Sequence, residues 1–177
     1  MKKYRDNTLA RKNLEAAILD EAVSHVKYTA WGNQAKAEGY PEIAHCYQVA
    51  ANNELSHAET WMRQLGLLRS VNENLQEAAE MEREGSSLYV DYASDAENEG
   101  FDELKEMFLC ASTSENNHME NFTRLHRELQ SGEMFVSDND KTKWMCYNCG
   151  FIMEGESPVD ICPLCGRPET WFIKMKD

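Results

Sequence analysis

The 177-residue chain lacks the features that a membrane or a polyanion would require. Lys and Arg number 18 against 31 Asp and Glu, without any basic cluster, so the net charge of −13 argues against nucleic acid and anionic membrane as partners. No apolar run approaches the roughly 20 residues of a membrane-spanning helix. The hydrophilic start shows no signal peptide, so we expect a cytoplasmic protein whose cysteines serve something other than disulfides.

Proline and glycine are also scarce, with 4 and 9 residues, and their positions leave room for four long helices. Four segments contain good helix formers and no internal proline, namely residues 9–38, 41–66, 72–99 and 101–132. Gly39 ends the first segment, and Pro41 opens the second. Gly100 separates the third from the fourth, which Gly132 closes.

One pattern, a Glu followed 33 residues later by Glu-x-x-His, occurs twice at an offset of 61 residues. Its members are Glu21, Glu54 and His57 in the first copy and Glu82, Glu115 and His118 in the second. Other identical residues keep the same offset, among them the pairs Asn13 and Asn74, Leu14 and Leu75, Tyr28 and Tyr89, Ala35 and Ala96, and Glu42 and Glu103. This regularity predicts an internal duplication.

The repeated residues are suited to binding two metal ions. A Glu and a His three residues apart lie one turn apart on the same helix face. Four helices that supply two single Glu residues and two Glu-x-x-His pairs have the donor set of a ferritin-like di-iron or di-manganese site. Four carboxylates also balance the charge of two divalent cations. One Glu-x-x-His pair is common on exposed helices, whereas two copies within a duplication favour metal ligands.

A second metal motif lies near the end of the chain. Cys146-x-x-Cys149-Gly and Cys162-Pro-x-Cys165-Gly are separated by twelve residues. Two such knuckles form a closed tetrahedral site of four thiolates, which holds zinc or a single iron, and their spacing does not distinguish the two metals. A zinc ribbon that only stabilises a small fold is therefore an alternative.

Together these features resemble the rubrerythrins, in which a ferritin-like di-iron bundle precedes a short rubredoxin-like iron domain. The resemblance rests on Leu-Asp-Glu21-Ala, Glu54-Leu-Ser-His57-Ala-Glu, Glu115-Asn-Asn-His118, the turns Glu-Gly-Tyr and Glu-Gly-Phe at 38–40 and 99–101, and Trp144-Met-Cys-Tyr-Asn-Cys-Gly-Phe. It implies an all-α four-helix ferritin-like bundle followed by a small rubredoxin-like metal-binding domain. The implied domains are residues 1–137 and 144–177, joined by a linker at 138–143.

The resemblance also implies roles for individual residues. The six repeated Glu and His residues correspond to the ligands of a carboxylate-bridged pair of irons, and the four knuckle cysteines to the ligands of one iron, with zinc possible instead. Tyr28 and Tyr89, each seven residues after a ligating Glu, match tyrosines that hydrogen-bond ligand carboxylates in this family. Their alternative role is as core aromatic residues. The isolated Cys46 and Cys110 are expected in the core.

One position departs from the family pattern. Typical rubrerythrins carry a further Glu three residues after the one that matches Glu82, in a helix with one extra residue. This chain has Gly85 there, and the extra residue is missing. Glu84 is the nearest substitute, but in a regular helix it faces roughly 200° away from Glu82. We therefore expect no π-type bulge and no redox-linked exchange of a ligand at this site.

The activity that the resemblance implies is peroxidase activity in oxidative-stress defence, with hydrogen peroxide reduced to water. Electrons would arrive through the four-cysteine iron from a rubredoxin or an NADH-dependent reductase. The alternatives are a di-iron oxidase or ferroxidase acting on dioxygen, and a non-enzymatic metal-binding or electron-transfer protein with zinc in the cysteine site.

The resemblance implies a homodimer in which electrons pass from the cysteine site of one chain to the di-iron site of the other, and the linker after Ser137, which begins at one end of the bundle, agrees with this. The connection between the second and third helices is short, which favours exchange of helical hairpins between chains.

Overall fold

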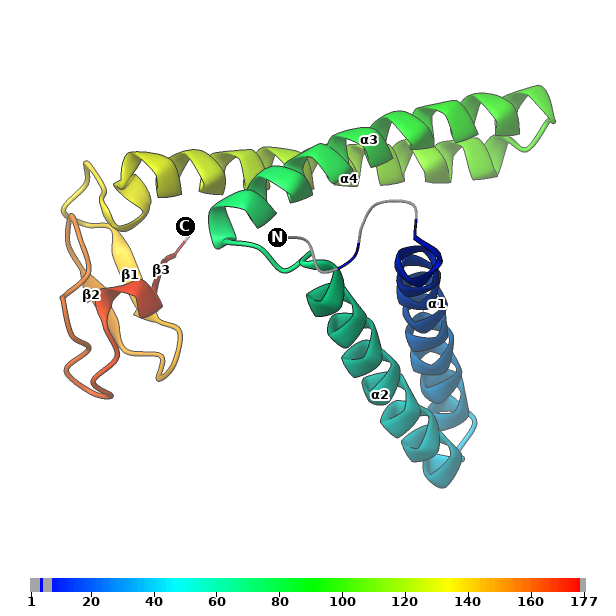
Figure 1. Ribbon diagram of the computed structural model, residues 1–177. Helices are drawn as coiled ribbons and strands as arrows, with labels where there is room; N and C mark the ends of the chain where they lie inside the picture. The colour runs from blue at the N-terminus through cyan, green and yellow to red at the C-terminus, as the bar shows by residue number, and fades with distance from the viewer. Residues whose placement is uncertain (1–3, 5–7, 176–177) are drawn as a thin grey trace. The chain divides into compact units, whose positions relative to one another are not determined.

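The computed structural model describes residue 4 and residues 8–175, where the chain forms four long helices and a small sheet (Figure 1). The helices are α1 (Leu9–Ala37), α2 (Pro41–Leu65), α3 (Val71–Asn98) and α4 (Asp102–Ser131). Their ends lie within one residue of those expected from the sequence, which confirms the glycine and proline breaks. The chain divides into two compact units, one ending at Arg69 and the other beginning at Ser70.

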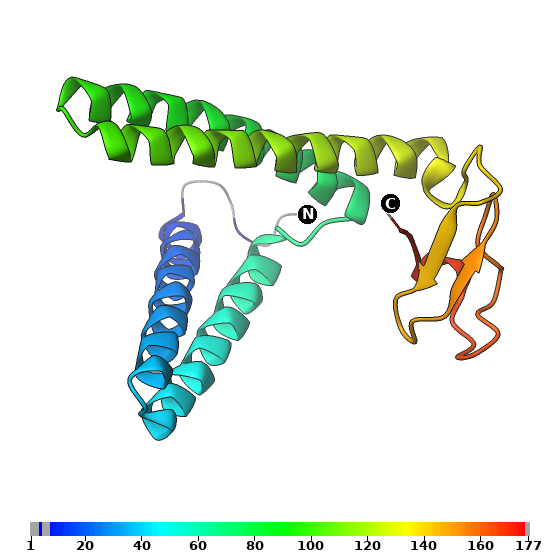
Figure 2. The same ribbon diagram turned by 180° about the vertical axis from the view of Figure 1, so that it is seen from behind.

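Each unit contains one helical hairpin, with α1 along α2 in the first and α3 along α4 in the second (Figures 1 and 2). The two hairpin turns have the same structure. Gly39 and Gly100 have φ angles of 86° and 81°, in the left-handed region that glycine adopts without steric cost. In the first turn the N–H of Tyr40 donates to the carbonyl of Ala35 at 2.9 Å, and in the second the N–H of Phe101 donates to the carbonyl of Ala96 at 2.8 Å. The duplication thus extends to the backbone of the turns.

Small residues line the contact between α1 and α2. Ala51 and Ala58 are buried there, and Gly32 lies against α2. A Cβ added at Gly32 would lie 3.3 Å from the Cβ of Tyr47 and 3.4 Å from the carbonyl oxygen of Ala44. Glycine at this position therefore lets the two helices approach more closely than alanine would.

A hydrogen bond crosses each hairpin at the same place; the bond in the first hairpin is partly buried, and the bond in the second is buried. In the first, Nδ1 of His25 lies 2.8 Å from the carbonyl oxygen of Ala51, which accepts its proton. In the second, the hydroxyls of Ser86 and Ser112 are 2.9 Å apart. Since both positions shift by 61 residues between hairpins, the helices of each pair are aligned in the same register.

Each hairpin by itself leaves large apolar side chains exposed, including Val26 and Leu55 in the first and Met107 in the second. The expectation that Cys46 and Cys110 are buried is wrong, because both are exposed. Within a unit, a helix is covered only where its partner helix contacts it, and neither cysteine lies on that side.

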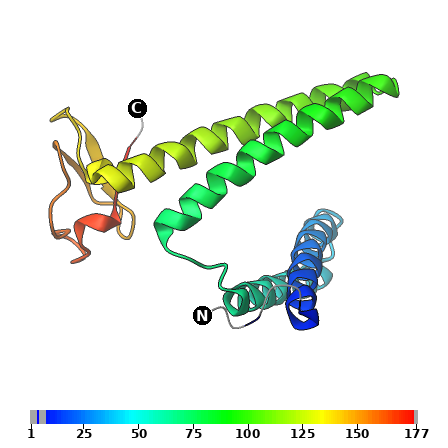
Figure 3. The ribbon, with the colours of Figure 1, turned by 45° about the horizontal axis from the view of Figure 1, so that its top comes forward.

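The C-terminal residues form a three-stranded antiparallel sheet with the order β2–β1–β3. Figure 3 shows this small domain, coloured yellow to red, following helix α4. The strands are β1 (Lys143–Cys146), β2 (Ile152–Glu154) and β3 (Phe172–Lys174), and short 3₁₀ turns precede them at η1 (Glu133–Phe135) and, before β3, at η2 (Glu169–Trp171). Trp144 is fully buried in the core of this domain with Cys146, Cys162 and Phe172. Its indole N–H donates to the carbonyl of Gly155 at 2.9 Å, so the buried polar group is satisfied.

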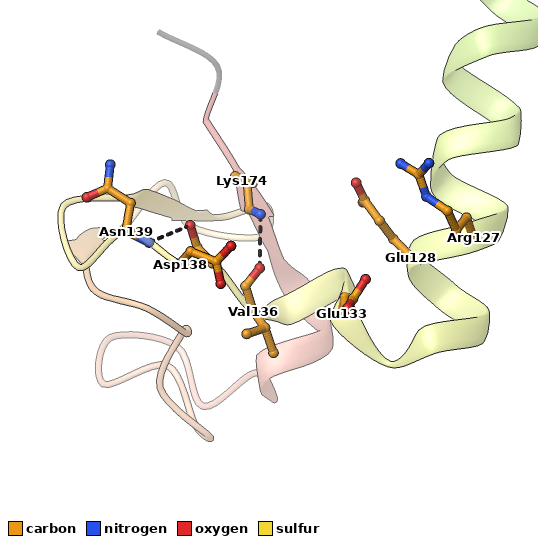
Figure 4. A pocket seen from close by; sticks show the side chains of 8 residues that line it. Arg127, Glu128, Glu133, Val136, Asp138, Asn139 and Lys174 are labelled. Atoms are coloured by element: carbon orange, nitrogen blue, oxygen red, sulfur yellow. Dashed lines mark hydrogen bonds between the residues drawn. The ribbon is translucent and has the colours of Figure 1, made fainter.

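The segment between α4 and β1 is hydrogen-bonded to the small domain (Figure 4). Ser137 donates its N–H to the carbonyl of Glu156 at 2.7 Å, and Nζ of Lys174 donates to the carbonyl of Val136 at 3.0 Å. A polar cavity of about 380 Å³ lies beside these contacts and reaches Arg127 on α4. The linker bounds at 138–143 stay a prediction.

Candidate metal centres

The first hairpin brings its three repeated residues together. Glu21 extends from α1, and Glu54 and His57 extend from neighbouring turns of α2. Nδ1 of His57 lies 3.0 Å from Oε2 of Glu54 and 3.5 Å from Oε2 of Glu21. The carboxylates are about one-fifth exposed, at 22% and 21%, whereas the imidazole is half exposed at 54%.

The second hairpin repeats this arrangement with Glu82 from α3 and Glu115 and His118 from α4. Nδ1 of His118 lies 3.3 Å from Oε2 of Glu115 and 3.4 Å from Oε2 of Glu82. In each set the three donor atoms lie within 4.8 Å of one another. Two ligands of one ion are at most about 4.4 Å apart at bond lengths near 2.2 Å, so small side-chain rotations bring all three onto one metal. Each hairpin thus carries half of a dinuclear donor set.

Hydrogen bonding to carboxylates shifts the acid–base equilibria of these groups. The Glu54 carboxylate raises the pKa of His57, with a smaller contribution from Glu21. The bond to Glu115 likewise raises the pKa of His118.

Glu82 and Glu115 share a hydrogen bond, which raises the pKa of Glu82 and lowers that of Glu115. Metal ligands must be deprotonated, so a metal ion that binds here would displace the protons that these groups hold.

The two tyrosines predicted near the ligands lie in aromatic clusters. The ring of Tyr28 is 5.9 Å from Trp31 and 6.1 Å from Tyr47, between ring centroids. Tyr89 is 6.1 Å from Tyr92 in the same way. These contacts agree with the alternative role as packed aromatics, and hydrogen bonding to a ligand carboxylate stays a prediction.

Helix α3 continues through Gly85 as a regular α-helix, which confirms the expected absence of a π-type bulge. A Cβ added at Gly85 would meet Cγ of Glu115 at 3.9 Å, so this position faces the second donor set. Glu84 is exposed and lies outside that set. Near Glu115, the face of α3 that points toward this residue therefore carries one carboxylate, that of Glu82.

The four knuckle cysteines converge on one point. Sγ of Cys146 lies 3.7 Å from Sγ of Cys165, and Sγ of Cys149 lies 3.6 Å from Sγ of Cys162. Sulfur atoms at the corners of a tetrahedron around a metal at about 2.3 Å are about 3.8 Å apart, whereas a disulfide would bring them to about 2.05 Å. The geometry fits one four-coordinate metal and agrees equally with iron and zinc.

The thiols also differ in acidity. The backbone N–H of Arg167 donates to the sulfur of Cys165 and lowers its pKa to about 6. Cys149 accepts from the N–H of Phe151, which lowers its pKa, but burial and the neighbouring thiols outweigh this and raise it to about 12. Cys165 therefore ionises more readily than Cys149, and a bound cation would stabilise both thiolates.

Within the residues that the structure describes, no helix is both long and apolar enough to cross a bilayer. Four helices with two Glu/Glu/His donor sets, followed by a small sheet with a four-cysteine site, define a ferritin-like di-metal carboxylate protein with a rubredoxin-like domain. The family model for rubrerythrin matches residues 12–71 and 73–148, and that for the rubrerythrin rubredoxin-like domain matches residues 144–173. The chain therefore belongs to the rubrerythrin family.

Two rubrerythrin sequences align with almost the whole chain. A rubrerythrin from Clostridium perfringens is 32% identical over 96% of this chain and 96% of its own length. One from Porphyromonas gingivalis is 30% identical over 99% of this chain and 94% of its own length. A solved structure of nigerythrin in a mixed-valence state covers 98% of this chain and 90% of its own at 26% identity, with a TM-score of 0.36.

Sequence reasoning missed the aromatic clusters around Tyr28 and Tyr89. Trp31 and Tyr92 are equivalent, as are Tyr47 and Phe108, and both pairs keep the offset of 61 residues. The signal was present in the repeat, but the residues are not identical, so a comparison of identities did not find them.

Proposed function

We propose that the protein is a peroxidase that reduces hydrogen peroxide to water in oxidative-stress defence. The observation that carries this proposal is the presence of two metal centres of different chemistry in one chain: carboxylate–imidazole donor sets and a four-thiolate site. When bound, a pair of ferrous ions can supply the two electrons that cleave the O–O bond of peroxide, and iron in the thiolate site can return electrons singly. Two protons and two electrons convert one peroxide into two waters.

The carboxylate centre is assigned to Glu21, Glu54 and His57 together with Glu82, Glu115 and His118. Their four carboxylates neutralise two divalent ions, which allows the ions to be enclosed without net charge. The adjacent carboxylates raise the pKa of His57 and His118 and so favour protonated imidazoles. Each imidazole must lose that extra proton before it binds a metal as a neutral ligand.

The thiolate centre is assigned to Cys146, Cys149, Cys162 and Cys165. Cys146 and Cys162 are buried, whereas Cys149 and Cys165 are partly exposed. An external donor, such as a rubredoxin or an NADH-dependent reductase, would approach on the exposed side. Cys146 and Cys162 are packed in the hydrophobic core with Trp144 and Phe172.

The test separates peroxide from dioxygen as the oxidant. Anaerobically reduced protein is mixed with each oxidant in a stopped-flow experiment, and the return of the ferric absorbance is followed at equal concentrations. We expect peroxide to react at least tenfold faster. Faster oxidation by dioxygen would instead support the oxidase or ferroxidase alternative.

The role of the thiolate site is tested with Cys162→Ser, which removes one of its ligands and leaves the carboxylate sets intact. We expect steady-state peroxide turnover with an NADH-linked donor to fall below a tenth, while a single oxidation of the pre-reduced carboxylate site by peroxide proceeds normally. Unchanged steady-state turnover would mean that the site is structural. A colourless thiolate site in protein purified from its native cells would favour zinc.

A further inference from the structure

Gly85 lies in the middle of α3, where the backbone gives no reason for a glycine. Helix α3 runs from Val71 to Asn98, and Gly85 is not among the glycines with a positive φ. A glycine inside a helix makes the folding equilibrium about fivefold less favourable than an alanine does. The reason for this glycine therefore lies outside the backbone of its own helix.

Packing between α3 and α4 does not require the glycine either. Outside its own turn of helix, a Cβ added at Gly85 would have one neighbour within 4 Å among the described residues, Cγ of Glu115 at 3.9 Å, which is an ordinary van der Waals contact. Gly32 in the first hairpin is different, because a Cβ there would meet two atoms of α2 at 3.3 and 3.4 Å. Close approach of the helices accounts for Gly32, whereas an alanine would fit at position 85.

The position faces the second donor set. Gly85 follows Glu82 by three residues, so the two lie one turn apart on the same face of α3. Across the hairpin, the Cγ atom of Glu115 that lies near Gly85 is bonded directly to the carboxylate carbon. The space that a side chain at position 85 would fill thus borders both carboxylates. We call this space the Gly85 notch.

The donor set beside the notch does not fill the coordination shell of a metal ion. Glu82, Glu115 and His118 supply three protein donors. Sites with three protein ligands keep a further position for water or substrate, whereas closed structural sites have four. The equivalent position in the first hairpin is Ser24, which has a side chain. The two donor sets therefore have identical ligands but differ in the room beside them.

We propose that Gly85 is a specificity-determining residue, whose notch admits a small exogenous anion to a metal held by the second donor set. Suitable anions have an oxygen or nitrogen donor and few atoms, such as azide, formate and the anion of hydrogen peroxide. The inference rests on the metal assignment made for the proposed function and does not depend on peroxide as the oxidant. A side chain at position 85 competes with the anion for the same space, so its size decides which anions enter.

Azide is the probe, because its bond to ferric iron gives a visible charge-transfer band. The full-length protein is loaded with iron, oxidised and titrated with azide, and a difference spectrum removes the constant absorbance of the cysteine site. We expect Gly85→Ala to raise the dissociation constant for azide about tenfold, since a methyl group that overlaps a bound ligand acts like overpacking. Gly85→Leu should abolish the band. Elemental analysis checks that each variant holds the wild-type amount of iron, and Gly85→Ala alone decides if leucine displaces iron.

The matched controls are Ser87→Ala and Ser87→Leu. Ser87 is exposed on α3 and, two residues after Gly85, faces roughly 200° away from it. Both controls should bind azide with a dissociation constant within about twofold of the wild-type value. An equal loss of azide binding in the controls and in the Gly85 variants would indicate a general disturbance of α3 and would overturn the proposal.

The stability of the metal-free protein separates a role toward the ligand from a role in packing. Because a Cβ fits at position 85, Gly85→Ala should shift the unfolding equilibrium about fivefold toward the folded state, while it weakens azide binding. A less stable Gly85→Ala protein would mean that packing requires the glycine, and the proposal would then be wrong. An azide affinity unchanged by Gly85→Ala would refute it as well.

The wild-type protein distinguishes failure of this inference from failure of the proposed function. Wild-type protein that holds iron in the carboxylate sets but binds no azide would refute the notch alone. Absence of iron from those sets would refute the metal assignment, and both proposals with it. Azide binding that depends on Gly85, in a protein that reacts faster with dioxygen than with peroxide, would refute the peroxidase function and support the notch.

Discussion

The buried hydrogen bond between Ser86 and Ser112 predicts a specific loss of stability in Ser112→Ala. Both side chains are 6% exposed, and their hydroxyls are 2.9 Å apart between α3 and α4. Removing one hydroxyl leaves the other without its partner, which costs about 1–3 kcal/mol. Removing both leaves no unpaired group, so the double alanine variant should be more stable than the sum of the single effects implies, by about 1 kcal/mol.

The same bond should influence metal binding. Ser86 lies one turn after Glu82, and Ser112 lies one turn before Glu115, so the bond fixes the relative height of the helices at the second donor set. Groups that orient metal ligands without binding the metal themselves typically contribute about 10–100-fold to metal affinity. Because Ser112 acts through the backbone rather than on a ligand, we expect the lower end, about tenfold.

Urea unfolding of the metal-free protein, followed by circular dichroism, measures the three free energies, and a competition titration with an iron chelator measures affinity. The control is Thr113→Ala, an exposed neighbour whose hydroxyl bonds only within α4, to the Leu109 carbonyl at 3.0 Å. It should change stability by less than about 0.5 kcal/mol. If Ser112→Ala matched this control, or if the two single effects were additive, the hydrogen bond would not contribute as reasoned.

Four further outcomes follow from the site. Glu54→Ala should lose most of the iron bound outside the cysteine site, by elemental analysis; retention of both irons with full turnover would contradict the ligand assignment. A heterodimer of Cys146→Ser and Glu115→Ala chains should recover some turnover if electrons cross between chains, and no recovery would place transfer within one chain. Crystal structures of both oxidation states should show iron shifts below about 1 Å with Glu84 outside the coordination sphere, a shift well under one ligand bond. Since Glu54 raises the pKa of His57 above 6.5, protons compete with iron for this imidazole at higher pH than usual. Iron affinity should therefore start to fall before the pH is lowered to 6.5. An affinity that stays constant down to pH 6 would contradict this prediction.

The helix bounds were predictable because they depend on local chemistry. Gly39 and Gly100 supply the left-handed residue that ends a helix, and Pro41 suits the first turn of the next. The donor sets were predictable for a different reason. A metal requires particular donor atoms at fixed spacing, and the offset of 61 residues repeats both the spacing and the residue types.

Burial and packing across helices were less accessible. The exposure of Cys46 could not be read from its residue type, because it depends on which helix face the partner covers. The aromatic contacts of Trp31 required the register between α1 and α2, which no local pattern fixes. The acidity of Cys165 likewise depends on an N–H that the folded turn at Arg167 directs toward its sulfur.

The duplication also separates two kinds of constraint. Inside a hairpin, equivalent positions have changed in pairs: His25 donates to a backbone carbonyl, so alanine suffices at 51, whereas Ser86 has a side-chain partner in Ser112. Such a pair can change freely because both members belong to one interface. The metal donors, in contrast, are identical in both hairpins. A metal ion requires particular donor atoms at fixed spacing, so a change in one partner of a Glu/Glu/His set cannot be offset by a change in its neighbour.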